Sequence, residues 1–122
     1  MSKVILIVED EPSNLKLLRD LLQASGYATI EATNGKQGTE LAKARKLDLI
    51  LMDIQMPEMD GLEATRILKA DVATRNIPIL ALTAYTMKGD REHMLEAGCD
   101  GYVAKPIDIQ EFLELVSEYL PA

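Results

Sequence analysis

The sequence predicts a doubly wound α/β domain, in which helices cover both faces of a parallel sheet. Apolar runs of strand length alternate with longer amphipathic stretches along the chain. Several runs are continuously apolar, as at residues 4–8 and 49–52, which is typical of strands buried on both faces. Strict alternation of strands and helices favours parallel strands joined by helical crossovers. A length of 122 residues suits one domain with its own core.

Each expected element has a local signal. The apolar runs predict strands at residues 4–8, 28–31, 49–52, 79–82 and 101–103. Helices are expected at residues 12–25, 34–46, 61–71, 87–97 and from 108 to 120. Pro12 suits a first helical turn, whereas Gly26 and Gly98 end the first and fourth helices. Asn34 and Asp108 each stand three residues before a Gln or Glu, which is the spacing of a capping box.

Composition excludes several classes of function. A formal net charge of -7 argues against a basic face that binds nucleic acid or an anionic membrane. Cys99 is the single cysteine, so no intrachain disulfide and no cysteine-based zinc site can form. No signal peptide and no membrane-spanning stretch is evident. We therefore expect a cytoplasmic protein with neither a nucleic-acid partner nor a membrane insertion.

Polar residues follow four of the five expected strands. In strand order they are Glu9 and Asp10, then Asp53, then Thr83 and Ala84, then Lys105 and Pro106. The ligand site of an open parallel sheet lies outside the carboxyl ends of its strands, so these residues would share one edge. Three carboxylates repel one another unless a cation lies between them, and Mg²⁺ suits such oxygen ligands. A lysine beside the metal would bind a dianion, so the pattern indicates phosphoryl transfer.

These residues resemble the signature of the receiver domain of two-component response regulators, in the CheY-like superfamily. The resemblance rests on Glu9-Asp10, on Asp53 within the stretch from Met52 to Gly61, on Thr83-Ala84 and on Lys105-Pro106, and it covers the whole chain. It implies a flavodoxin-like (βα)5 fold with strand order 2-1-3-4-5. It also implies one receiver domain over residues 1–122 without an output domain, most like stand-alone regulators of the DivK type. A receiver module from a hybrid histidine kinase is the alternative.

The resemblance assigns a chemical role to each polar strand end. Asp53 would accept a phosphoryl group from a phosphohistidine on a histidine kinase or a phosphotransfer protein. Glu9, Asp10, Asp53 and the backbone carbonyl of Gln55 would hold Mg²⁺, with Mn²⁺ as a substitute. Lys105 would pair with a phosphate oxygen. The chain would not be an enzyme in the usual sense, because it would catalyse only its own phosphorylation and slow dephosphorylation.

The resemblance also implies a switch. Thr83 would bind another phosphate oxygen, and Tyr102 would turn inward as Thr83 moves. Pro106 would follow a cis peptide bond. Access of water or of the donor to the phosphate would depend on Ala84, Gln55 and Tyr85.

Two partner surfaces are expected. The face made by the fourth helix, fifth strand and fifth helix would bind a downstream protein, through residues Lys88, Arg91, Tyr102 and Ile107. Leu17 lies far from the apolar face of the first helix, so it is either a plain exposed leucine or a contact for the phosphoryl donor. The same donor surface would include Ser13, Asn14 and Pro106. The chain itself would be a monomer or a weak dimer.

Simpler interpretations exist for each residue taken alone. Asp53 could be a cap after a strand, one of Glu9 and Asp10 could be merely solvated, and Thr83 and Tyr102 could be ordinary sheet residues. Their occurrence at successive strand ends, with Lys105, favours a common site.

Three other functions compete with the receiver. A haloacid-dehalogenase-like phosphatase needs a second acid two residues after its nucleophile, where this chain has Gln55. A flavin-binding module needs a hydroxyl- and glycine-rich loop after the first strand, where this chain has an acidic one. A protein-binding scaffold that works without phosphorylation would have no need of the acids, Thr83 and Lys105.

Overall fold

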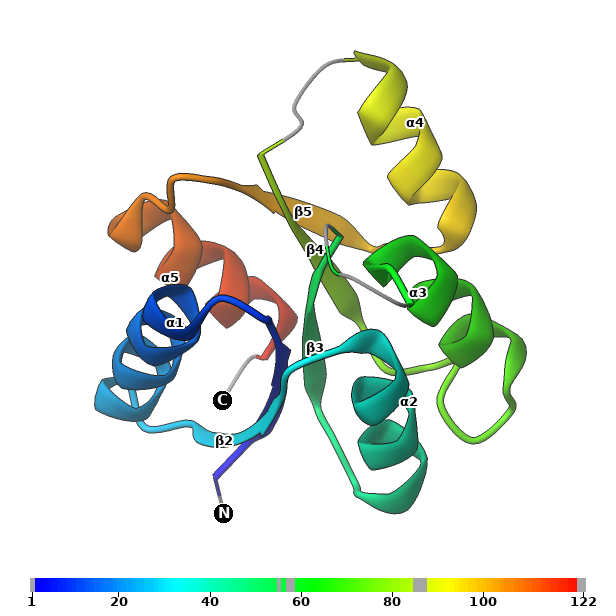
Figure 1. Cartoon of the computed structure of the whole chain (residues 1–122). Coiled ribbons are helices and arrows are strands. Elements are labelled where there is room, and N and C mark those ends of the chain that lie inside the picture. The colour runs from blue at the N-terminus through cyan, green and yellow to red at the C-terminus, as the bar shows by residue number, and fades with distance from the viewer. Residues whose placement is uncertain (1, 55, 57–58, 85–87, 121–122) are drawn as a thin grey trace.

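The computed structural model describes residues 2–54, 56, 59–84 and 88–120, and the side chains of all of these except residues 88–91. Its strands are β1 (Val4–Val8), β2 (Ala28–Ala32), β3 (Leu49–Asp53), β4 (Ile79–Thr83) and β5 (Gly101–Ala104). Its helices are α1 (Pro12–Ala24), α2 (Gly35–Ala44), α3 (Gly61–Ala70), α4 (Lys88–Ala97) and α5 (Ile109–Tyr119). All strand pairs are parallel, and their order is β2-β1-β3-β4-β5, so the predicted fold is confirmed (Figure 1).

Element boundaries differ from the expected ones by one or two residues. β2, β3, β4 and β5 each continue one residue further than expected, so Asp53 and Thr83 are the last residues of their strands instead of the first residues beyond them. The second helix runs from Gly35 to Ala44, instead of from residue 34 to residue 46. The expected start of the fourth helix, Met87, lies outside the described residues. None of these differences moves a polar residue away from its strand end.

Helices lie on both faces of the sheet (Figure 1), and an apolar layer packs between the sheet and the helices on each face. Successive strand residues point to opposite faces, so Ile5 and Ile7 pack with α1 and α5, whereas Leu6 and Val8 pack with the α2, α3 and α4 side. Phe112 of α5 is the largest of the fully buried side chains. The sheet is thus covered on both faces, and its polar strand ends are left to form a site. No helix of the described part is long and apolar enough to cross a membrane.

Side-chain caps determine where the helices begin. Asn34 accepts a hydrogen bond from the Gln37 backbone N–H at 2.8 Å, and the Gln37 side chain accepts one from the Thr33 N–H at 2.8 Å, as in a capping box shifted by one residue. Asp108 caps α5 in the expected way, accepting from the Glu111 N–H at 3.0 Å. These caps satisfy backbone donors that would otherwise lack a partner in the first turn.

Two further caps were not expected. Asp60 caps α3 by accepting from the Glu63 N–H at 2.8 Å. Glu11 caps α1 by accepting from the Asn14 N–H at 2.8 Å. Both acids therefore serve helix starts beside the candidate site and lie outside the acidic cluster described below.

Candidate functional site

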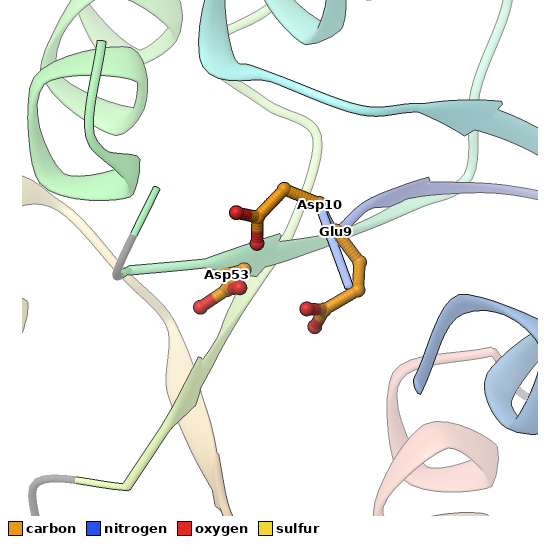
Figure 2. A group of neighbouring side chains, drawn as sticks. All are labelled: Glu9, Asp10 and Asp53. Carbon is orange, nitrogen blue, oxygen red and sulfur yellow. The ribbon is translucent and has the colours of Figure 1, made fainter. Parts of the chain in front are cut away.

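Three carboxylates meet at the carboxyl edge of the sheet. Glu9 and Asp10 follow β1, and Asp53 ends the neighbouring strand β3, where the register pairs Val8 with Met52. One oxygen from each carboxylate lies within 4.8 Å of the others. Figure 2 shows the side chains of Glu9 and Asp10 gathered beside that of Asp53. The structure thus brings together the three acids that the strand ends predicted.

Burial divides the three acids in an unexpected way. Glu9 is fully buried and Asp53 is 2% exposed, whereas Asp10 is exposed. The simpler interpretation, in which one acid of this adjacent pair is merely solvated, therefore does not apply to Glu9. The reason is that Glu9 extends the backbone pairing of β1 by donating its N–H to the Ala32 carbonyl at 3.0 Å, and this carries its side chain inward. An acid buried in this manner must have a polar partner, because an unpaired charge away from water is costly.

Lys105 is that partner, and it reaches a second acid as well. Its Nζ lies 3.1 Å from Glu9 Oε2 and 3.4 Å from Asp53 Oδ2. The backbone places it there, because the Lys105 N–H donates to the Thr83 carbonyl at 2.8 Å and the Lys105–Pro106 peptide bond is cis, as the resemblance implied. The sequence predicted a lysine near the acids but missed that Glu9 is its nearer partner. A glutamate side chain is longer than an aspartate side chain, and this length is the signal that could have indicated a contact between Glu9 and Lys105.

Proton affinities reflect this crowding. Burial, together with the hydrogen bond and the negative charge of Asp53, raises the pKa of Glu9 from 4.5 to about 7, against the opposing effect of Lys105. Burial alone would lower the pKa of Lys105, but its bond to Glu9 and the charge of Asp53 outweigh burial and raise that pKa. The cluster thus holds more negative charge than one lysine neutralises, and at neutral pH it favours an added proton or an added cation.

We expect this proton to make the metal-free protein less stable as the pH rises. The folded-state pKa of Glu9, about 7, lies above the ordinary value of 4.5, so the folded chain binds the proton more tightly than the unfolded chain does. The resulting stability is fully present below the unfolded pKa and is lost as the pH rises through the folded pKa. Relative to Glu9→Gln, wild type should lose up to about 3 kcal/mol over this interval, at about 1.4 kcal/mol per pKa unit.

Urea unfolding of both proteins in EDTA, at several pH values from 4.5 to 8, measures this difference. Because the comparison is between two proteins at each pH, the titration of groups that do not interact with Glu9 cancels. A constant difference between wild type and Glu9→Gln across the interval would contradict the raised pKa.

The remaining strand ends complete the edge. Thr83 is 1% exposed at the end of β4, and Ala84 after it is exposed. Tyr102 is half-buried and packs against the core layer that includes Met94 of α4. Gln55 and Tyr85 lie outside the described residues, as do the side chains of Lys88 and Arg91.

The expected donor surface is mixed in its exposure. Leu17 is 38% exposed on α1, which agrees with its predicted place away from the apolar face. Ser13 and Pro106 are exposed, and Asn14 is half-buried. Ile107, expected on the downstream-target surface, is half-buried and packs against the core layer beneath α1 and α5. Ile107 thus contributes part of its surface to the core.

The acidic cluster fits a hard divalent cation. Its donors are carboxylate oxygens, which are the ligands that Mg²⁺ and Mn²⁺ prefer, and the exposed Asp10 leaves one side open to water. The negative charge of Asp53, which after burial helps to raise the pKa of Glu9, would be balanced by a cation bound between the two carboxylates. Glu9, Asp10 and Asp53 are the described residues that could hold the ion. The bound ion would neutralise the negative charge of their carboxylate oxygens.

Comparison with known sequences identifies close relatives. The family described as "Response regulator receiver domain" matches residues 5–117. The polar-differentiation response regulator DivK of Brucella anthropi is 50% identical over 120 residues, which is 98% of each chain. DivK of Brucella ovis is 49% identical over the same length and coverage. The predicted similarity to DivK regulators is thereby confirmed.

Solved structures give the same result. The receiver domain of a sensor histidine kinase from Pseudomonas aeruginosa PAO1, which has a magnesium ion coordinated in its active-site cleft, is 36% identical with a TM-score of 0.92, and the match covers 100% of both chains. The chemotaxis protein CheY4 of Vibrio cholerae is 26% identical with a TM-score of 0.93, over 98% of this chain and 100% of that one. The family match over residues 5–117, together with these relatives, shows that this chain belongs to the response regulator receiver domain family and is a signalling protein.

Proposed function

We propose that this chain is a phosphorelay switch that accepts a phosphoryl group on Asp53 from the phosphohistidine of a histidine kinase or phosphotransfer protein. One observation carries the proposal. The Asp53 carboxylate, 2% exposed, has a lysine nitrogen 3.4 Å away and the oxygens of two further acids within 4.8 Å. A nucleophilic oxygen is thus flanked by a cation on one side and by cation ligands on the other, which is the arrangement that phosphoryl transfer requires.

The transfer itself exchanges one bond for another. An Asp53 oxygen attacks phosphorus while the phosphorus–nitrogen bond of the donor breaks, and the electron pair of that bond returns to the donor imidazole. Lys105 is already close to both Glu9 and Asp53, so only a short displacement brings its ammonium to a phosphate oxygen. Mg²⁺, or Mn²⁺, held by Glu9, Asp10, Asp53 and the Gln55 carbonyl, would neutralise the oxygens that gather there.

Phosphorylation would then shift a conformational equilibrium. The phosphoryl group adds about 1.5 to 2 negative charges, and only contacts that are better in one conformation can favour that conformation. Thr83 and Lys105 would supply these contacts at about 1.5 to 3 kcal/mol each, against the roughly 5 kcal/mol that a nearly complete shift requires. In the β4–β5 register Tyr102 pairs with Ala81, two residues before the Thr83–Ala104 pair and on the same face of the sheet, so a move of Thr83 would reach it.

The partner surfaces follow from the same proposal. The phosphoryl donor would contact Ser13, Asn14, Leu17 and Pro106, beside the acidic edge. A downstream protein would bind the α4–β5–α5 face, which carries Lys88, Arg91, Tyr102 and Ile107. Residues 1–122 would act as one receiver domain in the cytoplasm, as a monomer or weak dimer, and slow hydrolysis of the aspartyl phosphate would end the signal. Ala84, Gln55 and Tyr85 would affect the rate of that hydrolysis.

Labelling with a small phosphodonor tests the proposal. Incubation with acetyl phosphate or phosphoramidate and Mg²⁺ should add the mass of one phosphoryl group to the intact chain. The same incubation in EDTA should add none, because the crowded oxygens would remain without their cation. Intact-protein mass spectrometry measures both, and circular dichroism verifies folding. A folded chain that gains no mass with Mg²⁺ would contradict the switch and favour a scaffold that works without phosphorylation.

A further inference from the structure

A groove runs between β5 and the first turns of α5, on the face that is proposed to bind the downstream target. It has a volume of about 310 Å³. Its apolar lining includes Tyr102, Val103, Phe112 and Leu115, and Asp108 and Glu111 stand at its rim. This volume is at the lower end of ligand pockets, which are about 300 to 1,000 Å³, so it suits one or two anchoring side chains rather than a large ligand.

A row of carboxylates lies along α5 beside this groove. Asp108, Glu111, Glu114 and Glu118, which we name the α5 acidic ridge, are all exposed. Their spacing of three or four residues places the glutamates on one side of the helix, next to the groove residue Leu115. Residues 109–119 include no lysine, arginine or histidine. The groove is therefore bordered by negative charge along the length of the helix.

The ridge is not neutralised within the described part of the chain. No described lysine or arginine side chain forms an ion pair with it, whereas Asp20, Glu31, Asp71 and Asp100 each pair with a cation. Like charges three or four residues apart destabilise a helix. A partner that brings positive charge would relieve this repulsion while its apolar side chains fill the groove.

These observations select one kind of occupant. A second copy of this chain would place one ridge against another if the contact were symmetric, and the chain has a net charge of -7, so self-association is disfavoured. Nucleic acid carries the same sign of charge as the ridge. A helix that lies along α5 could match the ridge with basic residues one turn apart, and it could insert an apolar residue into the groove.

We propose that the groove between β5 and α5 binds a basic amphipathic helix of the downstream protein, with its apolar residues in the groove and its lysines or arginines on the α5 acidic ridge. This deepens the proposed function and rests on it for the identity of the target surface. Tyr102 lines the groove and is also the aromatic residue of the proposed switch. Phosphorylation of Asp53 would therefore change the shape of the groove, and so its affinity for the helix.

Fluorescence anisotropy with model peptides tests this proposal on the full chain. The probe is a labelled 14-residue helix of leucine, lysine and alanine, with a leucine stripe beside a lysine stripe. Two control peptides replace all lysines by glutamate or all leucines by serine. The probe should bind, and each control peptide should bind at least about fivefold more weakly, because the apolar anchors and the charges both contribute. Beryllofluoride with Mg²⁺ should tighten binding of the probe.

Matched variants separate a specific site from general attraction to an acidic protein. Glu111→Gln with Glu118→Gln should weaken probe binding by about fivefold. Glu40→Gln with Glu63→Gln removes the same charge from exposed positions on α2 and α3, and should have little effect. Equal weakening by both pairs, equal binding of the serine peptide, or probe-induced NMR shifts that avoid Val103, Phe112 and Leu115 would overturn the proposal. So would a dimer that the ridge variants abolish.

The outcomes also distinguish this proposal from the function on which it rests. If Asp53 gains a phosphoryl group but the probe does not bind the groove, the helix proposal fails and the phosphoacceptor role survives. If the probe binds the groove but no phosphoryl group is gained, the phosphoacceptor role fails and the docking surface survives.

Discussion

Asp53→Asn is expected to abolish phosphoryl labelling of this chain by acetyl phosphate. The amide nitrogen of asparagine is not a nucleophile, and its oxygen lacks the charge that the proposed attack on phosphorus requires. The replacement has nearly the same shape, so the buried end of β3 should keep its packing. It also removes a charge that raises the pKa of Glu9, and Lys105 keeps Glu9 as a partner at 3.1 Å. The variant should therefore fold, and its labelled fraction, read by intact mass, should fall to background.

Asp60→Asn is the matched control. Asp60 is exposed and caps α3 seven residues further along the chain, and asparagine caps helices about as well as aspartate does. Its labelling should equal that of wild type. Labelling that persists in Asp53→Asn would place the phosphoryl group on another acid and would refute the central assignment.

Gly61→Ala is expected to destabilise the fold and to disturb the same site. A Cβ at Gly61 would overlap the backbone carbonyl of Asp53 and would lie 2.8 Å from the Cα of Ile54. Both contacts are with backbone, which cannot move aside as a flexible side chain can. At an open helical position the change would stabilise by about 0.5 to 1 kcal/mol, but a forced overlap in a packed region costs about 1 to 3 kcal/mol or more.

We therefore expect Gly61→Ala to lower the free energy of unfolding by about 2 kcal/mol, measured by urea denaturation, and to slow labelling of Asp53 at pH 7. Labelling should slow because the overlap displaces the carbonyl of the phosphoacceptor itself. Glu63→Ala, two residues later on the exposed side of α3, is the control and should change neither quantity substantially. An unchanged or increased stability of Gly61→Ala would show that the end of β3 adapts without cost.

Local patterns in the sequence predicted the elements and most of their limits. Continuous apolar runs identified β1 and β3, because a strand buried on both faces cannot alternate with polar residues. Asn34 and Asp108 identified the starts of α2 and α5, because a side-chain acceptor is needed for the first unpaired backbone donors. Glu11 and Asp60 as caps were missed, since an acid before a helix is also compatible with a turn or with a ligand.

The position of the site followed from topology together with the resemblance. Once strands alternate with helices, the strands run parallel and their carboxyl ends share one edge, so Asp53 and Lys105 were expected at the same edge despite their separation in the chain. The structure agrees, with Lys105 Nζ at 3.4 Å from Asp53 Oδ2. The roles of Gln55 and Tyr85 remain predictions, because these residues lie outside the described part of the chain.

What the sequence determined by itself was the set of chemical groups and the edge at which they gather, because strands and helices are recognised from local patterns and parallel strands end at one edge. Only the tertiary structure decided which acid of the adjacent pair is buried and which cation it meets. Glu9 turns inward because its backbone extends the pairing of β1. Its carboxylate there contacts Lys105, which directly follows β5 and lies 96 residues further along the chain. Burial and charge pairing depend on every element around a group, and a sequence read one segment at a time does not include those neighbours.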